Sequence, residues 1–193
     1  MSEGRAHLDA LLAELEREFP RFRIIDKRDS PLSRTIDVVL KILTLGGMRT
    51  DMTHYHTVIG DRLYVPPGWD DDPLSAAITL RHERVHLRQR RRYTLPGMTL
   101  LYLLFPLPLF LSYGRARIEW EAYEETLRAT LELCGREALE SAALKRRIVS
   151  RFTAPDYGWM WPFPRQVSRW YDEAVERLLA QADRAPASNG QGS

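Results

Sequence analysis

An uncharged stretch of 21 residues, TLPGMTLLYLLFPLPLFLSYG (Thr94 to Gly114), constrains the fold of this chain more than any other part of it. About 20 consecutive apolar residues are long enough to cross a bilayer as one helix. Pro96, Pro106 and Pro108 oppose a regular helix, because proline has no backbone N–H and its ring collides with the preceding turn. The stretch therefore crosses a membrane, rests on its surface, or bends through the protein interior.

The sequence HERVH, from His82 to His86, lies just before this stretch. Asp72 and Pro73 provide an N-cap and a first helical residue, so the motif is expected on a helix. Positions i and i+4 project from one face of a helix, which lets both imidazoles reach a single ion. Glu83 sits about 100° further round, where it can contact a metal-bound water as general base. This pattern predicts a site for one zinc ion (Zn2+).

Zinc in a hydrolytic site needs a third protein ligand, and several carboxylates follow the uncharged stretch. In RIEWEAYEETLRATLEL, the helical neighbours of Glu119 are all uncharged, whereas those of Glu121 include Glu125, Arg128 and Glu132. Glu119 is therefore the carboxylate expected to face inward. A buried carboxylate needs a partner, for which zinc and an arginine are the alternatives.

The proposed ligands limit the topology of the uncharged stretch between them. A single membrane crossing would put His86 and Glu119 on opposite sides of the bilayer, so a zinc site and a single span exclude each other. Two arrangements agree with the zinc site. One is a buried, bent connection, and the other is an interfacial loop with Arg88 to Arg92 facing anionic headgroups.

HExxH followed by Glu-x-x-Ala on a later helix resembles the gluzincin metallopeptidases. RIEWEAY resembles a motif of the HtpX-like and CaaX-protease-like membrane peptidases, and it also resembles the minigluzincins. The resemblance implies that His82, His86 and Glu119 bind zinc and that Glu83 is the general base. It also implies a peptide or protein substrate that pairs with an edge strand. Tyr123 stands where the family has an aspartate that orients a ligating histidine, so another group makes that bond or the site is weaker.

The remaining sequence predicts a helix-rich α+β fold of the zincin-like, minigluzincin type. Leucines at helical spacing indicate a first helix that ends before Pro20, and a short strand is expected at 22–25. Further helices are expected near 31–46, from Asp72 onward, and at 114–135, 137–152 and 165–182. Two β-prone runs around Gly60-Asp61 predict a hairpin before the histidine helix. We expect one domain over 1–184, with its core at 22–152 and an apolar insert at 94–114, followed by a disordered tail at 185–193.

Composition and charge exclude some classes of partner and of covalent structure. A net charge of +2 argues against a nucleic-acid partner, and a single cysteine, Cys134, rules out an internal disulfide. The N-terminus has no secretory signal pattern, so a cytoplasmic protein is expected, which can also bind the inner face of an anionic membrane peripherally.

The sequence predicts a zinc-dependent hydrolase, specifically a metalloendopeptidase. The alternatives are a zinc-binding regulator without proteolytic activity and a membrane-associated helical adaptor without metal. His54, His56, Tyr64 and Tyr157 are all candidates for the oxyanion-stabilising residue.

Overall fold

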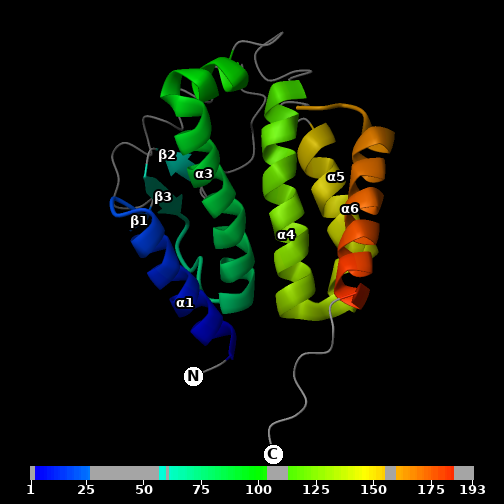
Figure 1. Ribbon diagram of the computed structural model, residues 1–193, viewed down its shortest axis with the longest axis horizontal. Coiled ribbons are helices and arrows are strands. Elements are labelled where there is room, and N and C mark those ends of the chain that lie inside the picture. The colour runs from blue at the N-terminus through cyan, green and yellow to red at the C-terminus, as the bar shows by residue number, and fades with distance from the viewer. Residues whose placement is uncertain (1–2, 27–56, 60, 104–112, 155–159, 185–193) are drawn as a thin grey trace, which may run out of the picture.

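The computed structural model describes residues 3–26, 57–59, 61–103, 113–154 and 160–184, with residues 57, 59 and 94–103 described by their backbone alone. The described residues form a helix-rich α+β fold with a small sheet (Figure 1). The elements are α1 (Glu3–Glu18), β1 (Arg23–Asp26), β2 (Thr57–Ile59), β3 (Arg62–Val65), α3 (Pro73–Leu103), α4 (Tyr113–Leu139), α5 (Ala142–Thr153) and α6 (Pro164–Arg184).

One half of the molecule packs α1 and the sheet against α3. The sheet order is β1-β3-β2, with β1 parallel and β2 antiparallel to the central strand. Leu8, Leu11 and Leu15 recur at helical spacing, so one face of α1 is buried. That face meets Leu63 of β3 and Leu80 of α3 in a continuous apolar core.

The other half is made of α4, α5 and α6, whose apolar faces form a second core around Phe152. The rings of Trp120, Tyr123 and Trp170 surround Phe152, with centroids 5.9, 5.4 and 6.4 Å from it. These aromatic side chains pack together where the three helices meet.

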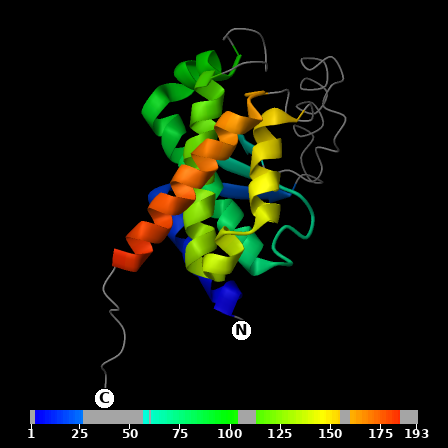
Figure 2. The ribbon, with the colours of Figure 1, turned by 90° about the vertical axis from the view of Figure 1, so that its right-hand side faces the viewer.

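Helices α3 and α4 lie side by side and join the two halves (Figures 1 and 2). They are antiparallel, so the connection between them begins and ends at the same end of the molecule. This arrangement agrees with the two topologies that avoid a single membrane crossing between His86 and Glu119. Among the described residues, no helix is both long enough and apolar enough to span a bilayer.

Several local predictions are confirmed. The hairpin around Gly60-Asp61 is formed by β2 and β3, with Thr57 opposite Tyr64. The Asp72 carboxylate accepts hydrogen bonds from the backbone N–H groups of Leu74 and Ser75, at 3.2 and 3.3 Å, as an N-cap does.

Two helix boundaries differ from the prediction. Pro96 does not end α3, which continues to Leu103 and changes direction in its C-terminal part (Figure 1). A proline inside a helix removes one backbone hydrogen bond, which can bend the helix without ending it. Helix α4 is interrupted at Gly135 (φ 83°) but resumes as far as Leu139. The helix expected at 31–46 and the tail at 185–193 lie outside the described residues.

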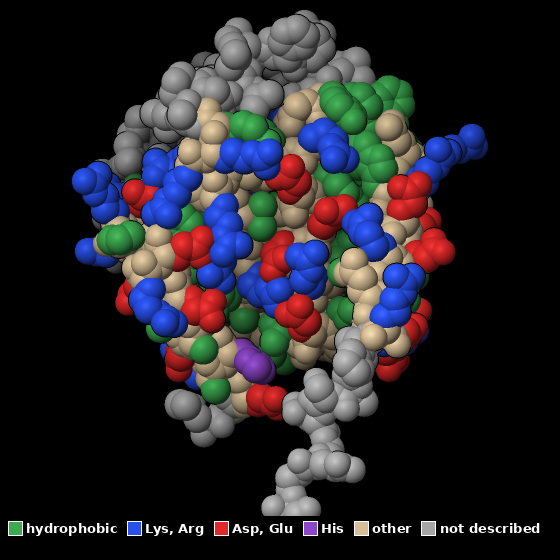
Figure 3. Space-filling view, in the orientation of Figure 1, with side chains coloured by type: hydrophobic (Ala, Val, Ile, Leu, Met, Phe, Trp, Pro, Cys, Tyr) green, Lys and Arg blue, Asp and Glu red, His purple; other side chains and the backbone are tan. Residues whose placement is uncertain are grey.

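Ion pairs engage much of the arginine run that follows the histidines. Arg84 and Arg88 both bind the carboxylate of Glu18 on α1, each with an N–O distance of 2.6 Å. Arg90 pairs with Asp61 beside the hairpin, and Arg91 lies over the ring of Phe19 at 4.1 Å. Charged side chains of both signs consequently mix over this face of the molecule (Figure 3). Much of the arginine run thus connects α3 to α1 and to the sheet.

Candidate metal centre

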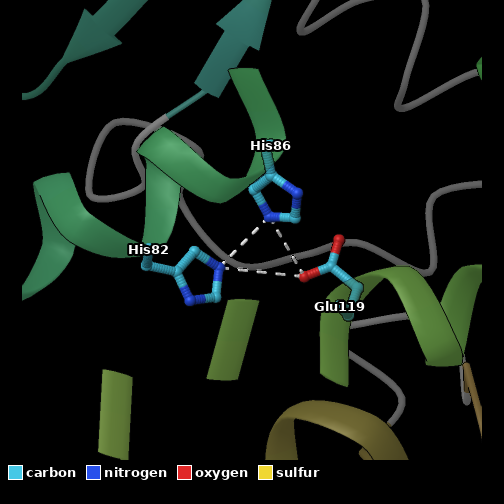
Figure 4. Close-up of side chains that lie close together, drawn as sticks. All are labelled: His82, His86 and Glu119. Atoms are coloured by element: carbon cyan, nitrogen blue, oxygen red, sulfur yellow. Dashed lines mark hydrogen bonds and ion pairs between the residues drawn. The ribbon is translucent and has the colours of Figure 1, made fainter. Parts of the chain in front are cut away.

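His82 and His86 project from one face of α3 toward Glu119 of α4, as Figure 4 shows. The Nε2 atoms of the two histidines are 3.2 Å apart. One carboxylate oxygen of Glu119 lies 4.0 Å from Nε2 of His82 and 3.7 Å from Nε2 of His86. The three residues predicted as zinc ligands therefore converge, although 32 residues lie between His86 and Glu119 in the sequence.

These separations fit the size of a tetrahedral zinc site. Zinc–nitrogen and zinc–oxygen bonds of about 2.0–2.1 Å at tetrahedral angles place neighbouring ligand atoms about 3.4 Å apart. The distance of 3.2 Å between the two histidine Nε2 atoms is close to this value. The distances from these atoms to the Glu119 oxygen exceed it by a few tenths of an ångström. A small movement of the carboxylate would complete the geometry.

The tautomer of His82 is set by Thr126 on α4. The Thr126 hydroxyl donates to the carbonyl oxygen of Ala122 at 3.1 Å, so its oxygen faces His82 as an acceptor. Nδ1 of His82 lies 3.0 Å from that oxygen and therefore carries the proton. The lone pair of His82 is left on Nε2, which faces Glu119.

His86 is held in the same tautomer by Gln89. The side-chain amide nitrogen of Gln89 donates to the Ile118 carbonyl and to the Glu121 carboxylate, both at 2.9 Å. Because both of these partners only accept, the Gln89 oxygen must be the atom that lies 2.9 Å from Nδ1 of His86. Nδ1 of His86 therefore donates, and Nε2 is again the atom that faces the candidate site.

Burial controls the charge of the histidine pair. Desolvation, together with the nearby His86, lowers the pKa of His82 to about 3, so this ring is neutral at physiological pH. Desolvation also opposes the charged form of His86, but the carboxylates of Glu119 and Glu83 outweigh it and raise the pKa of His86. Without a metal, Nε2 of His86 can keep a proton and donate it to His82. A divalent cation would take the place of this proton.

Glu83, the predicted general base, is buried on α3 with 9% of its surface exposed. Its carboxylate is close enough to raise the pKa of His86. It thus lies beside the three converging side chains without belonging to the set of ligand atoms that could hold a metal. This placement agrees with a role on a water molecule.

Tyr123 does not orient a histidine through a carboxylate as the family aspartate would. Its ring packs edge-on against His82, with centroids 4.8 Å apart, and backs that ring from the side of the second core. Burial, followed by the negative charge of Glu119, raises the pKa of Tyr123, so the phenol stays protonated. The polar contacts to the histidines come from Thr126 and Gln89.

The sequence did not identify Thr126 and Gln89 as partners of the histidines. The signal was present, because an uncharged glutamine lies on the histidine helix and a threonine lies on the apolar side of α4. Of the candidates for oxyanion stabilisation, Tyr64 is buried on β3, and His54, His56 and Tyr157 lie outside the described residues.

Comparison of the chain with protein-family models, with curated proteins and with solved structures found no match. The geometry of the residues themselves is therefore the basis for assigning a function.

Proposed function

We propose that the chain is a zinc-dependent hydrolase, with His82, His86 and Glu119 as zinc ligands and Glu83 as general base. The observation that carries this proposal is that a neighbouring side chain fixes the tautomer of each histidine. Thr126 and Gln89 fix the Nδ1 protons, so the Nε2 atoms of both histidines face the same carboxylate. Two imidazoles, each held by a hydrogen bond at Nδ1, and one carboxylate form a ligand set typical of catalytic zinc.

When bound in such a site, zinc lowers the pKa of a coordinated water to about 7 and polarises the carbonyl under attack. The chain's own residues supply the proton transfer and the orientation. The Glu83 carboxylate accepts the proton of the water and can return it to the leaving group. Thr126 and Gln89 keep the imidazoles correctly turned, and Tyr123 and Phe152 exclude water from the side of the second core.

A peptide is the substrate that the arrangement around α3 favours. Strand β2 is at one edge of the sheet and lies beside α3, which carries the histidines. An extended peptide can add to such an edge through backbone hydrogen bonds, which would place a scissile amide along the histidine helix. The resemblance of HERVH and RIEWEAY to gluzincin metallopeptidases supports the same substrate class and a zincin-like arrangement of the fold.

The replacement Glu83→Gln tests this proposal. It removes the general base and keeps the shape of the side chain, so zinc binding should persist while turnover falls by about 10²–10⁴-fold. Turnover is measured on a library of internally quenched peptides with zinc-loaded protein. The matched control is Glu132→Gln, an exposed carboxylate on α4 that should leave turnover unchanged.

Two results would reject the proposal. If the wild-type protein binds zinc and cleaves no member of the library, the site serves a regulatory protein without proteolytic activity. If cleavage persists in Glu83→Gln, the proton is accepted elsewhere and the assigned mechanism is wrong.

A further inference from the structure

Exposed aromatic side chains from two separate segments meet at one end of the molecule. Tyr113 at the start of α4 is 52% exposed, and Phe163 just before α6 is 45% exposed. Trp161 lies between them, with ring centroids 5.2 Å from Tyr113 and 4.9 Å from Phe163. We call these three rings the aromatic tip. Figure 3 shows hydrophobic side chains gathered over the upper parts of α4 and α6.

The aromatic tip lies where other elements also end. The C-terminal part of α3, the start of α4 and the start of α6 all lie at this end in both ribbon views (Figures 1 and 2). Tyr113 and Phe163 are the exposed large hydrophobic residues of the part of the chain that the structure describes. Exposed apolar groups that cluster in this way mark an interaction surface more often than scattered ones do.

The two sequence segments that carry the aromatic tip contain basic residues and no acidic ones. The sequence from Arg84 to Ile118 contains seven arginines and no acidic residue, and Tyr157 to Tyr171 contains Arg165 and Arg169 and no acidic residue. Many arginines of α3 are engaged by α1 and the sheet, but Arg117 and Arg165 are exposed and form no ion pair with any described residue. Arg117 follows Tyr113 by one helical turn, and Arg165 follows Phe163 by two residues.

A groove between α5 and α6 continues this surface. Its volume is about 610 Å³, and its lining includes Arg146, Arg165 and the hydroxyl-bearing residues Ser150, Thr153 and Ser168, with no acidic residue among them. Basic and hydroxyl groups beside an apolar tip are suited to phosphate groups at the boundary of a hydrocarbon layer.

We propose that this end of the molecule binds the surface of an anionic lipid bilayer. The rings of Tyr113, Trp161 and Phe163 enter the boundary between headgroups and acyl chains, where amphipathic aromatic rings are enriched. Arg117 and Arg165, set back from the tip, meet the lipid phosphates. Acidic side chains would be repelled from such a surface, and both sequence segments lack them. The surface includes none of the candidate zinc ligands, and its test needs neither zinc nor turnover.

The test measures co-sedimentation of the 193-residue protein with phosphatidylcholine vesicles, prepared with and without phosphatidylglycerol. We expect binding to the anionic vesicles that weakens with added salt. Loss of one positive charge should weaken binding about fivefold, so Arg165→Glu should weaken it roughly 25-fold. The matched control is Arg184→Glu at the opposite end of the same helix, which should bind like the wild type.

A second variant replaces all three tip residues, Tyr113, Trp161 and Phe163, with serine. It should bind anionic vesicles at least about tenfold more weakly, because the variant has no apolar ring surface to transfer from water into the bilayer. Circular dichroism and thermal unfolding establish that each variant is folded. Absence of vesicle binding in the wild type, or equal losses in Arg165→Glu and Arg184→Glu, overturns the proposal. A wild-type dimer that the serine variant dissociates, measured by light scattering, would instead assign the tip to contact between two copies.

Discussion

The role assigned to Gln89 predicts that two replacements of this residue lower the free energy of unfolding by similar amounts but differ in their effect on zinc affinity. Gln89 is 3% exposed and makes three hydrogen bonds, to His86, to the Ile118 carbonyl and to Glu121. Gln89→Met keeps the length of the side chain and removes all three. Gln89→Glu keeps an oxygen that accepts from Nδ1 of His86 but loses the N–H groups that donate to Ile118 and Glu121. Its carboxylate therefore faces two groups that only accept hydrogen bonds.

The magnitudes follow from the bonds that are lost. A neutral hydrogen bond contributes about 0.5–1.5 kcal/mol, a bond to a charged group about 1.5–3 kcal/mol, and a buried polar atom left unpaired adds its own cost. After allowance for the apolar burial of methionine, Gln89→Met should lower the free energy of unfolding by about 2–4 kcal/mol. Gln89→Glu loses two bonds and buries a carboxylate, so a similar loss is expected.

Zinc affinity should respond differently to the two replacements. Loss of an outer hydrogen bond to a metal-bound histidine weakens binding by about 10–100-fold, which is the result expected for Gln89→Met. Gln89→Glu still accepts the Nδ1 proton of His86, so its affinity should stay within about threefold of the wild type or increase. Competition with a chromophoric zinc chelator measures affinity, and urea unfolding of the zinc-free protein measures stability.

Thr130→Val is the matched control for Gln89. Thr130 is buried on α4 one turn beyond Thr126, and its hydroxyl donates to the Thr126 carbonyl at 2.8 Å. Its replacement should cost about 1 kcal/mol and leave zinc affinity unchanged. The reasoning fails if Gln89→Met binds zinc as tightly as the wild type, or if Gln89→Glu loses as much affinity as Gln89→Met.

Three further predictions concern the core, an ion pair and pH. Phe152→Ala empties the centre of the second core and should lower the free energy of unfolding by about 3–5 kcal/mol, measured by urea unfolding, with an unchanged value as the contradictory result. The pKa of Glu18 is lowered, chiefly by its hydrogen bond from Arg88, so its stabilisation is present above the ordinary glutamate pKa and disappears as the pH falls through the lowered value. Glu18→Gln should therefore cost about 0.5–1 kcal/mol at pH 7 and progressively less as the pH falls through the lowered pKa, whereas the exposed Glu16→Gln should cost nothing at pH 7. Burial lowers the pKa of His86 but the carboxylates of Glu119 and Glu83 raise it by more, so zinc must displace a proton. Chelator competition between about pH 5 and 8 should show affinity that falls with decreasing pH by about one proton per zinc, and a flat profile would contradict the proposed protonation of His86.

The sequence predicted the elements whose signals are local. The N-cap at Asp72, the hairpin around Gly60-Asp61 and the shared face of His82 and His86 each follow from residues within one or two turns. The inward direction of Glu119 also followed from its uncharged neighbours on the same helix. Its convergence with the histidines required the antiparallel pairing of α3 and α4, which could be inferred only through the requirement for a third ligand.

Other features depend on contacts that one sequence cannot reveal. Gln89 bonds across to the Ile118 carbonyl and Glu121, so its role depends on how α3 and α4 pack. The charged side of α4 also contacts α3, because Arg81 bridges Glu125 and Glu132 there. Pro96 was expected to break its helix, and α3 continues past it. In each case tertiary contacts decided what local propensity left undetermined.

The most direct test is zinc K-edge X-ray absorption of the purified, zinc-supplemented protein, combined with elemental analysis of its zinc content. We predict one zinc per chain, bound only by nitrogen and oxygen at about 2.0–2.1 Å, with imidazole scattering that decreases in His86→Ala. Less than stoichiometric zinc would contradict a metal centre built from His82, His86 and Glu119. A sulfur ligand at about 2.3 Å, which only Cys134 or a methionine could provide, would contradict it as well.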